Sequence, residues 1–324
     1  MSLNAIIKSK SIYMLYLLPF LVIGIAFFRY WLGGEYTPCG IDGLISLSFL
    51  EAYEGSFWLD KVGLLLLLSL AFLLFFIADR YKFLSHVSVL PSFLYSLLTV
   101  GVLCHYGVNA YLFAAFFVAL AVAYLQSAIV HFKTNAPVFN FGFFIALSVL
   151  LCPDLFALVP WAVVVLPFSG RATLKDMVAL LLGFGTMFFL VWGYYFLSGD
   201  SGGLFTLFWD KIWEGDSFIQ IVSAKPIVFI IIGILIFASF GNVLINYPTV
   251  IVAQRRGLLS MLSMLFFLGG SMFIIPCSCY GGMYIVAIPL VYLFSQYFIS
   301  HHTKWAGNML FLLLLVACGW LIFG

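Results

Sequence analysis

Charged residues are scarce in this chain, and their scarcity excludes most classes of soluble protein. Only 8% of the 324 residues are Asp, Glu, Lys or Arg, whereas 65% are hydrophobic, and the mean hydropathy is +1.19. A typical soluble domain carries about 25% charged residues. A chain with so little charge cannot cover a surface that faces water on all sides, so it needs lipid as its surroundings.

A basic tract is also absent, so nucleic acid is not an expected partner. The first residues carry Lys8 and Lys10, and a long apolar run follows without a small-residue cleavage site. This pattern predicts an uncleaved first membrane helix. The partners that we expect are membrane lipids and, as an alternative, another membrane protein.

Eleven apolar segments predict an all-α fold, a polytopic transmembrane helical bundle that forms one domain over residues 1–324. Residues 64–76 are apolar on every face except at Ser69, which excludes the alternating pattern of a membrane barrel. The segments are 11–31, 62–78, 83–104, 109–130, 138–152, 155–168, 177–197, 226–245, 258–275, 281–299 and 305–323. The two short segments within 138–168 predict either two crossings or one re-entrant hairpin, which would leave nine full spans.

The distribution of charge predicts which side of the membrane each loop occupies. If Lys8 and Lys10 are inside, alternation places ten of the 14 Lys and Arg residues in inner loops, as the positive-inside rule requires. Ten of the 12 acidic residues then fall in outer loops, an asymmetry that this rule does not demand. We therefore expect a bacterial cytoplasmic (inner) membrane protein with its N-terminus inside and its functional site at the outer face.

Two outer loops, 32–60 and 198–225, are longer than a connection requires, and such loops often carry function. In the second loop, apolar residues recur at helical spacing from Leu204 to Trp213. This pattern predicts a helix that lies in the membrane interface, with Trp209 and Trp213 at headgroup depth. A similar interfacial helix is predicted at 42–54 in the first loop.

Acidic side chains concentrate in the first long loop, where Glu35, Asp42, Glu51 and Glu54 follow the first apolar segment. A carboxylate at a membrane surface can act as a general base or can hold a divalent cation. The alternative is a solvated loop that anchors the interface. Asp154 lies at a predicted turn on the same side, where it either joins these acids or only makes the turn.

The order of these features resembles the membrane module of the GT-C glycosyltransferases: one membrane helix, a long acidic outer loop with interfacial helices, then closely joined helices. The stretch that carries the resemblance is Gly34-Glu-Tyr-Thr-Pro-Cys-Gly-Ile-Asp-Gly43, with Glu51-Ala-Tyr-Glu54 behind it. The resemblance implies a glycosyltransferase that takes a sugar from a polyprenyl-phosphate carrier, with Glu35 or Asp42 as the catalytic base. Residues 281–304 also look like uncharacterised bacterial multi-pass membrane proteins, which implies no function.

The substrate-binding set that we predict contains residues on the same outer side. Arg29 lies near the outer end of the first apolar segment, where it could bind the phosphate of a lipid-linked substrate. The other members are Glu51, Glu54, Asp154, Trp209 and Trp213.

Two other functions stay open. No Asp, Glu or Lys lies near the middle of any segment, which argues against ion-coupled transport but permits a transporter or lipid flippase without ion coupling. A non-enzymatic envelope assembly subunit is the third alternative.

The cofactor is unknown, with a divalent cation as one candidate. The six cysteines all map to the outer half, where disulfides, metal binding or simple packing are the alternatives.

Overall fold

The computed structural model of the chain describes residues 13–31, 57–84, 87–103, 108–131, 134–198, 203–213, 226–246, 250–275, 281–300 and 304–323. Within these ranges the secondary structure is helical, without a strand. Among the described residues, six helices are long and apolar enough to cross a membrane, as an integral membrane protein requires: Lys61–Arg80, Ala110–Val130, Leu174–Leu197, Pro226–Ile245, Val252–Ile274 and Gly282–Ile299.

Helices occupy all eleven of the apolar segments. They are α2 (Tyr13–Trp31), α4 (Phe57–Arg80), α5 (Leu90–Ser96) continued by the π-helix η1 (Leu97–Leu103), α6 (Ala110–Val130), α7 (Ala136–Leu151), the 3-10 helix η2 (Pro153–Ala157) with α8 (Leu158–Phe168), α9 (Leu174–Leu197), α12 (Pro226–Asn246), α13 (Val252–Ile274), α14 (Gly282–Ile299) and α15 (Lys304–Phe323). The predicted helical class is confirmed, and the number of complete crossings stays a prediction.

The predicted segment 83–104 is wrong at its start, because α5 begins only at Leu90. The hydroxyl of Ser88 accepts a hydrogen bond from the backbone nitrogen of Leu90 at 3.2 Å. Pro91 follows in the first turn, where its missing N–H costs nothing. Turn chemistry, which hydropathy does not register, therefore decides where this helix begins.

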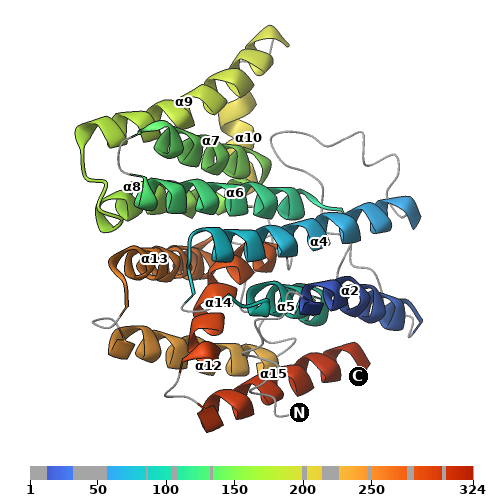
Figure 1. Cartoon of the computed structure of the whole chain (residues 1–324). Helices are drawn as coiled ribbons and strands as arrows, with labels where there is room; N and C mark the ends of the chain where they lie inside the picture. The colour runs from blue at the N-terminus through green and yellow to red at the C-terminus, as the bar shows by residue number, and fades with distance from the viewer. Residues whose placement is uncertain are drawn as a thin grey trace.

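Helix α14 forms the centre of the molecule. All of its residues from Gly282 to Ile299 are buried, and in Figure 1 it runs steeply across the neighbouring helices. Two tyrosine hydroxyls fix it: Tyr95 of α5 donates to the carbonyl oxygen of Tyr284 at 3.2 Å, and Tyr292 donates to that of Leu74 in α4 at 2.9 Å. Because the central helix is sealed from the surroundings, the other helices form the surface that a membrane would contact.

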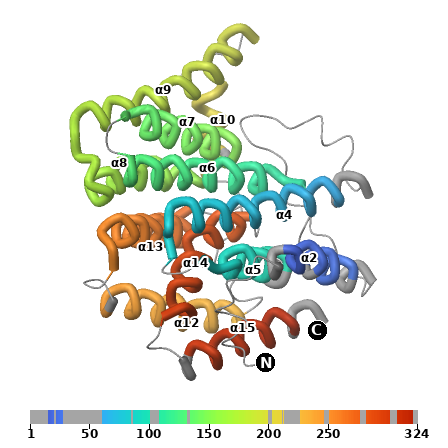
Figure 2. Tube along the Cα trace, viewed as in Figure 1, coloured from blue at the N-terminus to red at the C-terminus, as the bar shows by residue number. Residues whose placement is uncertain are grey.

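Helices α9, α7, α6 and α4 stack in that order, as the chain trace in Figure 2 shows. Glycine permits the closest approach, between α7 and α9. A methyl group built at Gly142 would lie 2.5 Å from the carbonyl oxygen of Leu180, and one built at Gly183 would overlap that of Phe139. Close packing at small residues is the usual way in which helices associate in membranes.

Small residues in the sequence predict close helix approach at Gly183, Gly185, Gly269 and Gly270, and the structure confirms this for Gly183 but not for the other three. A methyl group at any of the three would meet no atom within 4 Å among the described residues. Gly183 lies on the side of α9 that faces α7, as Leu180 does one turn earlier, whereas Gly185, two residues further on, lies on another side. Sequence alone cannot tell which side of a glycine-bearing helix finds a partner.

The described turns and helix ends fall into two groups, at opposite ends of the helix stack. One, here called the Arg171 end, holds the end of α6, the α8–α9 turn and the start of α13. The other, here called the Asp154 end, holds the start of α6, η2 and the start of α14. This grouping agrees with the alternation of sides in the sequence. The basic residues predict that the Arg171 end faces the cytoplasm.

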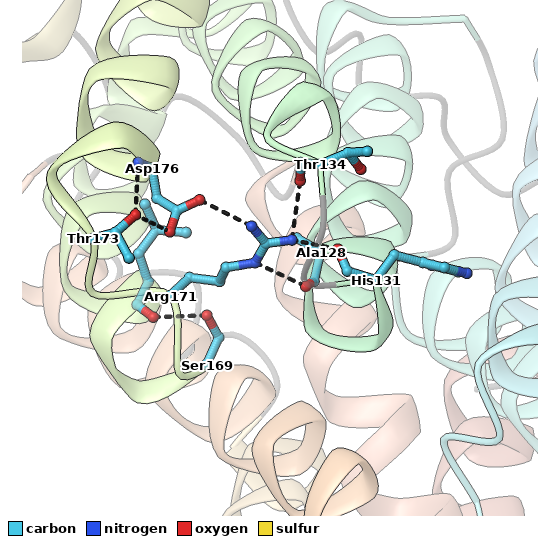
Figure 3. Close-up of polar contacts among 8 residues, drawn as sticks. Ala128, His131, Thr134, Ser169, Arg171, Thr173 and Asp176 are labelled. Atoms are coloured by element: carbon cyan, nitrogen blue, oxygen red, sulfur yellow. Dashed lines mark hydrogen bonds and ion pairs between the residues drawn. The ribbon is translucent and has the colours of Figure 1, made fainter.

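Arg171 is a buried side chain that links the end of α6 to the start of α9, and its set of contacts is here called the Arg171 clamp (Figure 3). Its guanidinium pairs with the carboxylate of Asp176 at 3.0 Å, and the two side chains are only 3% and 2% exposed. It also donates to the carbonyl oxygens of Ala128 and Thr134, both at 3.0 Å, and to that of His131. The last carbonyls of a helix have no partner within the helix, so Arg171 satisfies the end of α6 and ties it to α9.

Candidate functional site

The Asp154 end holds a carboxylate that two other elements position. Tyr111, in the first turn of α6, donates its hydroxyl hydrogen to Oδ2 of Asp154 at 2.8 Å. Asn109 caps this helix, because its side-chain oxygen accepts a hydrogen bond from the backbone nitrogen of Leu112 at 2.7 Å. Gly281, just before α14, has no side chain, and any Cβ there would overlap the Tyr111 ring. The tyrosine is therefore held between α14 and η2.

A change of backbone conformation brings Asp154 to this position. Helix α7 ends at Leu151, Cys152 is extended, and Pro153 opens the 3-10 helix η2 with Asp154 in its first turn. The turn predicted at this site is confirmed. The carboxylate does more than make the turn, since it also meets Tyr111 and a pocket.

The pocket beside Asp154 is small and open on one side: its volume of about 290 Å³ includes the space outside its mouth, and the enclosed part holds about one water molecule. Its walls come from η2, the last two turns of α13 and the first turns of α14: Asp154, Leu155, Leu268, Ser271, Met272, Ile275, Gly282 and Val286. One carboxylate and one hydroxyl thus face a mostly apolar lining. Such a surface can accept one hydroxyl group of a ligand next to hydrocarbon.

Helix α10 (Gly203–Trp213) covers the neighbouring surface and confirms the helix predicted in the second long loop. Leu204 and Ile212 are buried, and the ring of Phe208 meets that of Phe156 in η2 with centroids 5.9 Å apart. Phe205 and Trp209 are 62% and 55% exposed. The apolar side of α10 is therefore divided: one part docks on the protein, and the other is available to a membrane interface.

The structure brings together only part of the predicted site. Asp154 and Trp209 lie on adjoining elements, since α10 packs against η2. Arg29 is in α2, which packs against α4, α5, η1 and α15 rather than against the helices that line the pocket. The side chains of Arg29 and Trp213 lie outside the described part of the chain, as do the acids Glu35, Asp42, Glu51 and Glu54.

No group of three or more His, Cys, Asp or Glu residues suited to a metal ion occurs within the described ranges. A divalent cation at Asp154 would therefore need further ligands besides the described His, Cys, Asp and Glu residues. Of the cysteines, Cys152 and Cys318 are buried among apolar side chains, which agrees with a packing role for these two.

The sequence alone does not single out Tyr111 and Arg171, although both make important contacts in the structure. Tyr111 sits within an apolar segment and carries no charge, so only the capping pattern that starts at Asn109 hints at its place near a loop. Arg171 looks like an ordinary inner-loop cation, and orientation alone explains its presence. Its buried contacts become visible only when α6 and α9 are placed side by side.

Comparison with known proteins supplies no family: no protein-family model, no curated protein and no solved structure matches the chain.

Proposed function

We propose that this protein is an integral membrane glycosyltransferase that acts at the outer face of a bacterial inner membrane on a polyprenyl-phosphate-linked sugar. The observation that carries the proposal is the Asp154 pocket, in which a carboxylate held by Tyr111 faces apolar walls. Carboxylates accept strong hydrogen bonds from hydroxyl groups, and the walls of Leu268, Met272 and Val286 suit hydrocarbon. A lipid-linked sugar offers both kinds of group on one molecule.

In the proposed reaction, a carboxylate of the first long loop, Glu35 or Asp42, takes the proton from an acceptor hydroxyl. The hydroxyl oxygen then attacks the anomeric carbon, and the bond from that carbon to the phosphate oxygen breaks. Polyprenyl phosphate leaves with the bonding electron pair. Asp154 binds sugar hydroxyls and orients them, and an oriented substrate reacts faster because less freedom is lost on the way to the transition state.

The alternatives predict other locations for a site. A carrier requires a binding site that is reached from both sides, whereas the Asp154 pocket is lined only by residues near one end of α13 and α14. An assembly subunit requires a partner and no turnover. A surface pocket that contains one carboxylate supports the enzyme best.

The first test measures binding by native mass spectrometry of the full chain in micelles. The probes are a polyprenyl-phosphate hexose and polyprenyl phosphate without sugar. We expect tighter binding of the sugar-bearing probe, and we expect Asp154→Asn to weaken that binding about 10- to 100-fold, since a hydrogen bond to a charged group contributes about 1.5–3 kcal/mol. Asp210→Asn, which changes an exposed acid of α10, is the matched control.

The second test measures turnover as release of polyprenyl phosphate from the labelled hexose probe in the presence of a membrane extract. We expect Glu35→Gln or Asp42→Asn to abolish release while binding persists. Equal binding of the two probes by the wild-type chain, or release that is unaffected by both substitutions, would overturn the proposal. Co-purification of a stoichiometric partner without turnover would favour an assembly subunit.

A further inference from the structure

Buried side chains near the Arg171 end carry polar atoms without a hydrogen-bond partner in the part of the chain that the structure describes. They include the amide nitrogens of Gln126 in α6 and Gln254 in α13, and Oε1 of Gln296 in α14. The three residues are 3%, 8% and 7% exposed. Buried polar groups in native proteins almost always have partners, and where the protein offers none, ordered water usually serves.

Two of these amides belong to one crossing, where α6 meets α13 at Gly257. A Cβ atom built at Gly257 would lie 2.9 Å from Oε1 and 3.4 Å from Nε2 of Gln126. The amide thus rests against bare backbone, in space that any other residue at 257 would fill. Gln254 precedes Gly257 by three residues on the same helix, which places both on one face.

An aromatic pair covers the crossing without supplying hydrogen-bond acceptors to it. The ring of Phe83 lies 3.1 Å from the Cβ position of Gly257 and packs against the ring of Tyr292, with centroids 4.6 Å apart. The Tyr292 hydroxyl donates its hydrogen to the carbonyl oxygen of Leu74. Among the described residues, neither amide nitrogen has an acceptor.

We propose that Gln126 and Gln254 hold bound water in a small hydrated chamber between α6 and α13, entered from the Arg171 end. Both residues lie within one turn or so of a helix end at that side, since α6 ends at Val130 and α13 begins at Val252. Their unsatisfied atoms are N–H donors, which need an oxygen acceptor, and water that enters from that end can supply one. The chamber is separate from the Asp154 pocket and does not depend on glycosyl transfer.

Cysteine accessibility tests the proposal in the full chain, in lipid nanodiscs that expose both ends. Single cysteines replace Gln126 or Gln254 in a version in which the native cysteines are serine and whose thermal midpoint matches that of the wild type. The thiolate attacks the sulfenyl sulfur of a small, water-soluble thiosulfonate reagent, a disulfide forms and sulfinate leaves, whereas a thiol in dry apolar surroundings stays protonated and reacts slowly. The controls are Val122→Cys, fully buried in α6, and Lys175→Cys, exposed at the same end.

If the chamber holds water, Gln126→Cys and Gln254→Cys should react at least about 100-fold faster than Val122→Cys, because burial in a dry core raises a thiol pKa by several units. Lys175→Cys sets the upper limit of the rate. Labelling of either position at the Val122→Cys rate would overturn the proposal. As a second readout, Gln126→Met should lower the thermal midpoint if it expels bound water, whereas a dry, unpaired amide predicts a rise.

Discussion

The clamp at Arg171 yields a prediction about stability that can be worked out from its contacts. In Arg171→Met, a side chain of similar length would keep much of the packing but would remove every donor. Oδ1 of Asp176 would then lose its cation in a site where the carboxylate is only 2% exposed. The carbonyl oxygens of Ala128, His131 and Thr134 would lose their donor at the same time.

The magnitude follows from the uncompensated charge. Breaking one partner of a buried ion pair costs about 3–5 kcal/mol, mainly because the other charge stays buried alone. Asp176 still accepts a hydrogen bond from the Thr173 hydroxyl at 2.6 Å, so we expect the free energy of unfolding to fall by an amount in the lower part of that range. The double variant Arg171→Met/Asp176→Asn should recover about 1–2 kcal/mol, because it leaves no buried charge.

The assay is reversible unfolding of the full chain in mixed micelles, followed through the free energy of unfolding. Lys175→Met removes the same charge from an exposed side chain four residues away, and it should change stability by less than about 0.5 kcal/mol. Two results would contradict this role of Arg171. One is a free energy of unfolding for Arg171→Met within about 1 kcal/mol of that for Lys175→Met. The other is a double variant that is no more stable than Arg171→Met.

Two further substitutions test the packing and the pocket. Gly183→Ala should destabilise the chain by about 1–3 kcal/mol because its methyl group meets a carbonyl oxygen of α7, whereas Gly185→Ala, which meets no described atom within 4 Å, should be neutral or stabilising in the same unfolding assay. Tyr111→Phe should lower the affinity for the sugar-bearing probe about 3- to 10-fold in native mass spectrometry, because Asp154 loses the donor that orients it. Tyr81→Phe, at the Arg171 end, should leave this affinity unchanged. If the two variants bind the probe equally well, Tyr111 does not contribute to the site.

Hydropathy located every helix that the structure assigns to a candidate span, because the cost of exposing backbone or charge to hydrocarbon is a local property of about 20 residues. The amphipathic pattern likewise located α10. Errors arose where another effect decided the outcome. Ser88 and Pro91 set the start of α5, and the orientation of α9 decides which of Gly183 and Gly185 meets α7.

The candidate site was predictable only in part. Asp154 stood out because a carboxylate beside proline in an apolar stretch is conspicuous. Tyr111 did not, since a tyrosine in an apolar segment looks like any other aromatic residue. Tyr111 and Asp154 are 43 positions apart in the chain, and they come into contact only because α6 and α7 pack together.

The sequence by itself determined that this chain is helical, apolar and suited to cross a bilayer, because those properties sum over each segment and do not depend on neighbours. Its basic residues also predict which end faces the cytoplasm. Only the tertiary structure decided that α14 is sealed in the centre, that Arg171 is a clamp and that Asp154 faces a pocket. Each of these facts depends on contacts between helices far apart in the chain, and a contact has no signal in the local pattern of either partner.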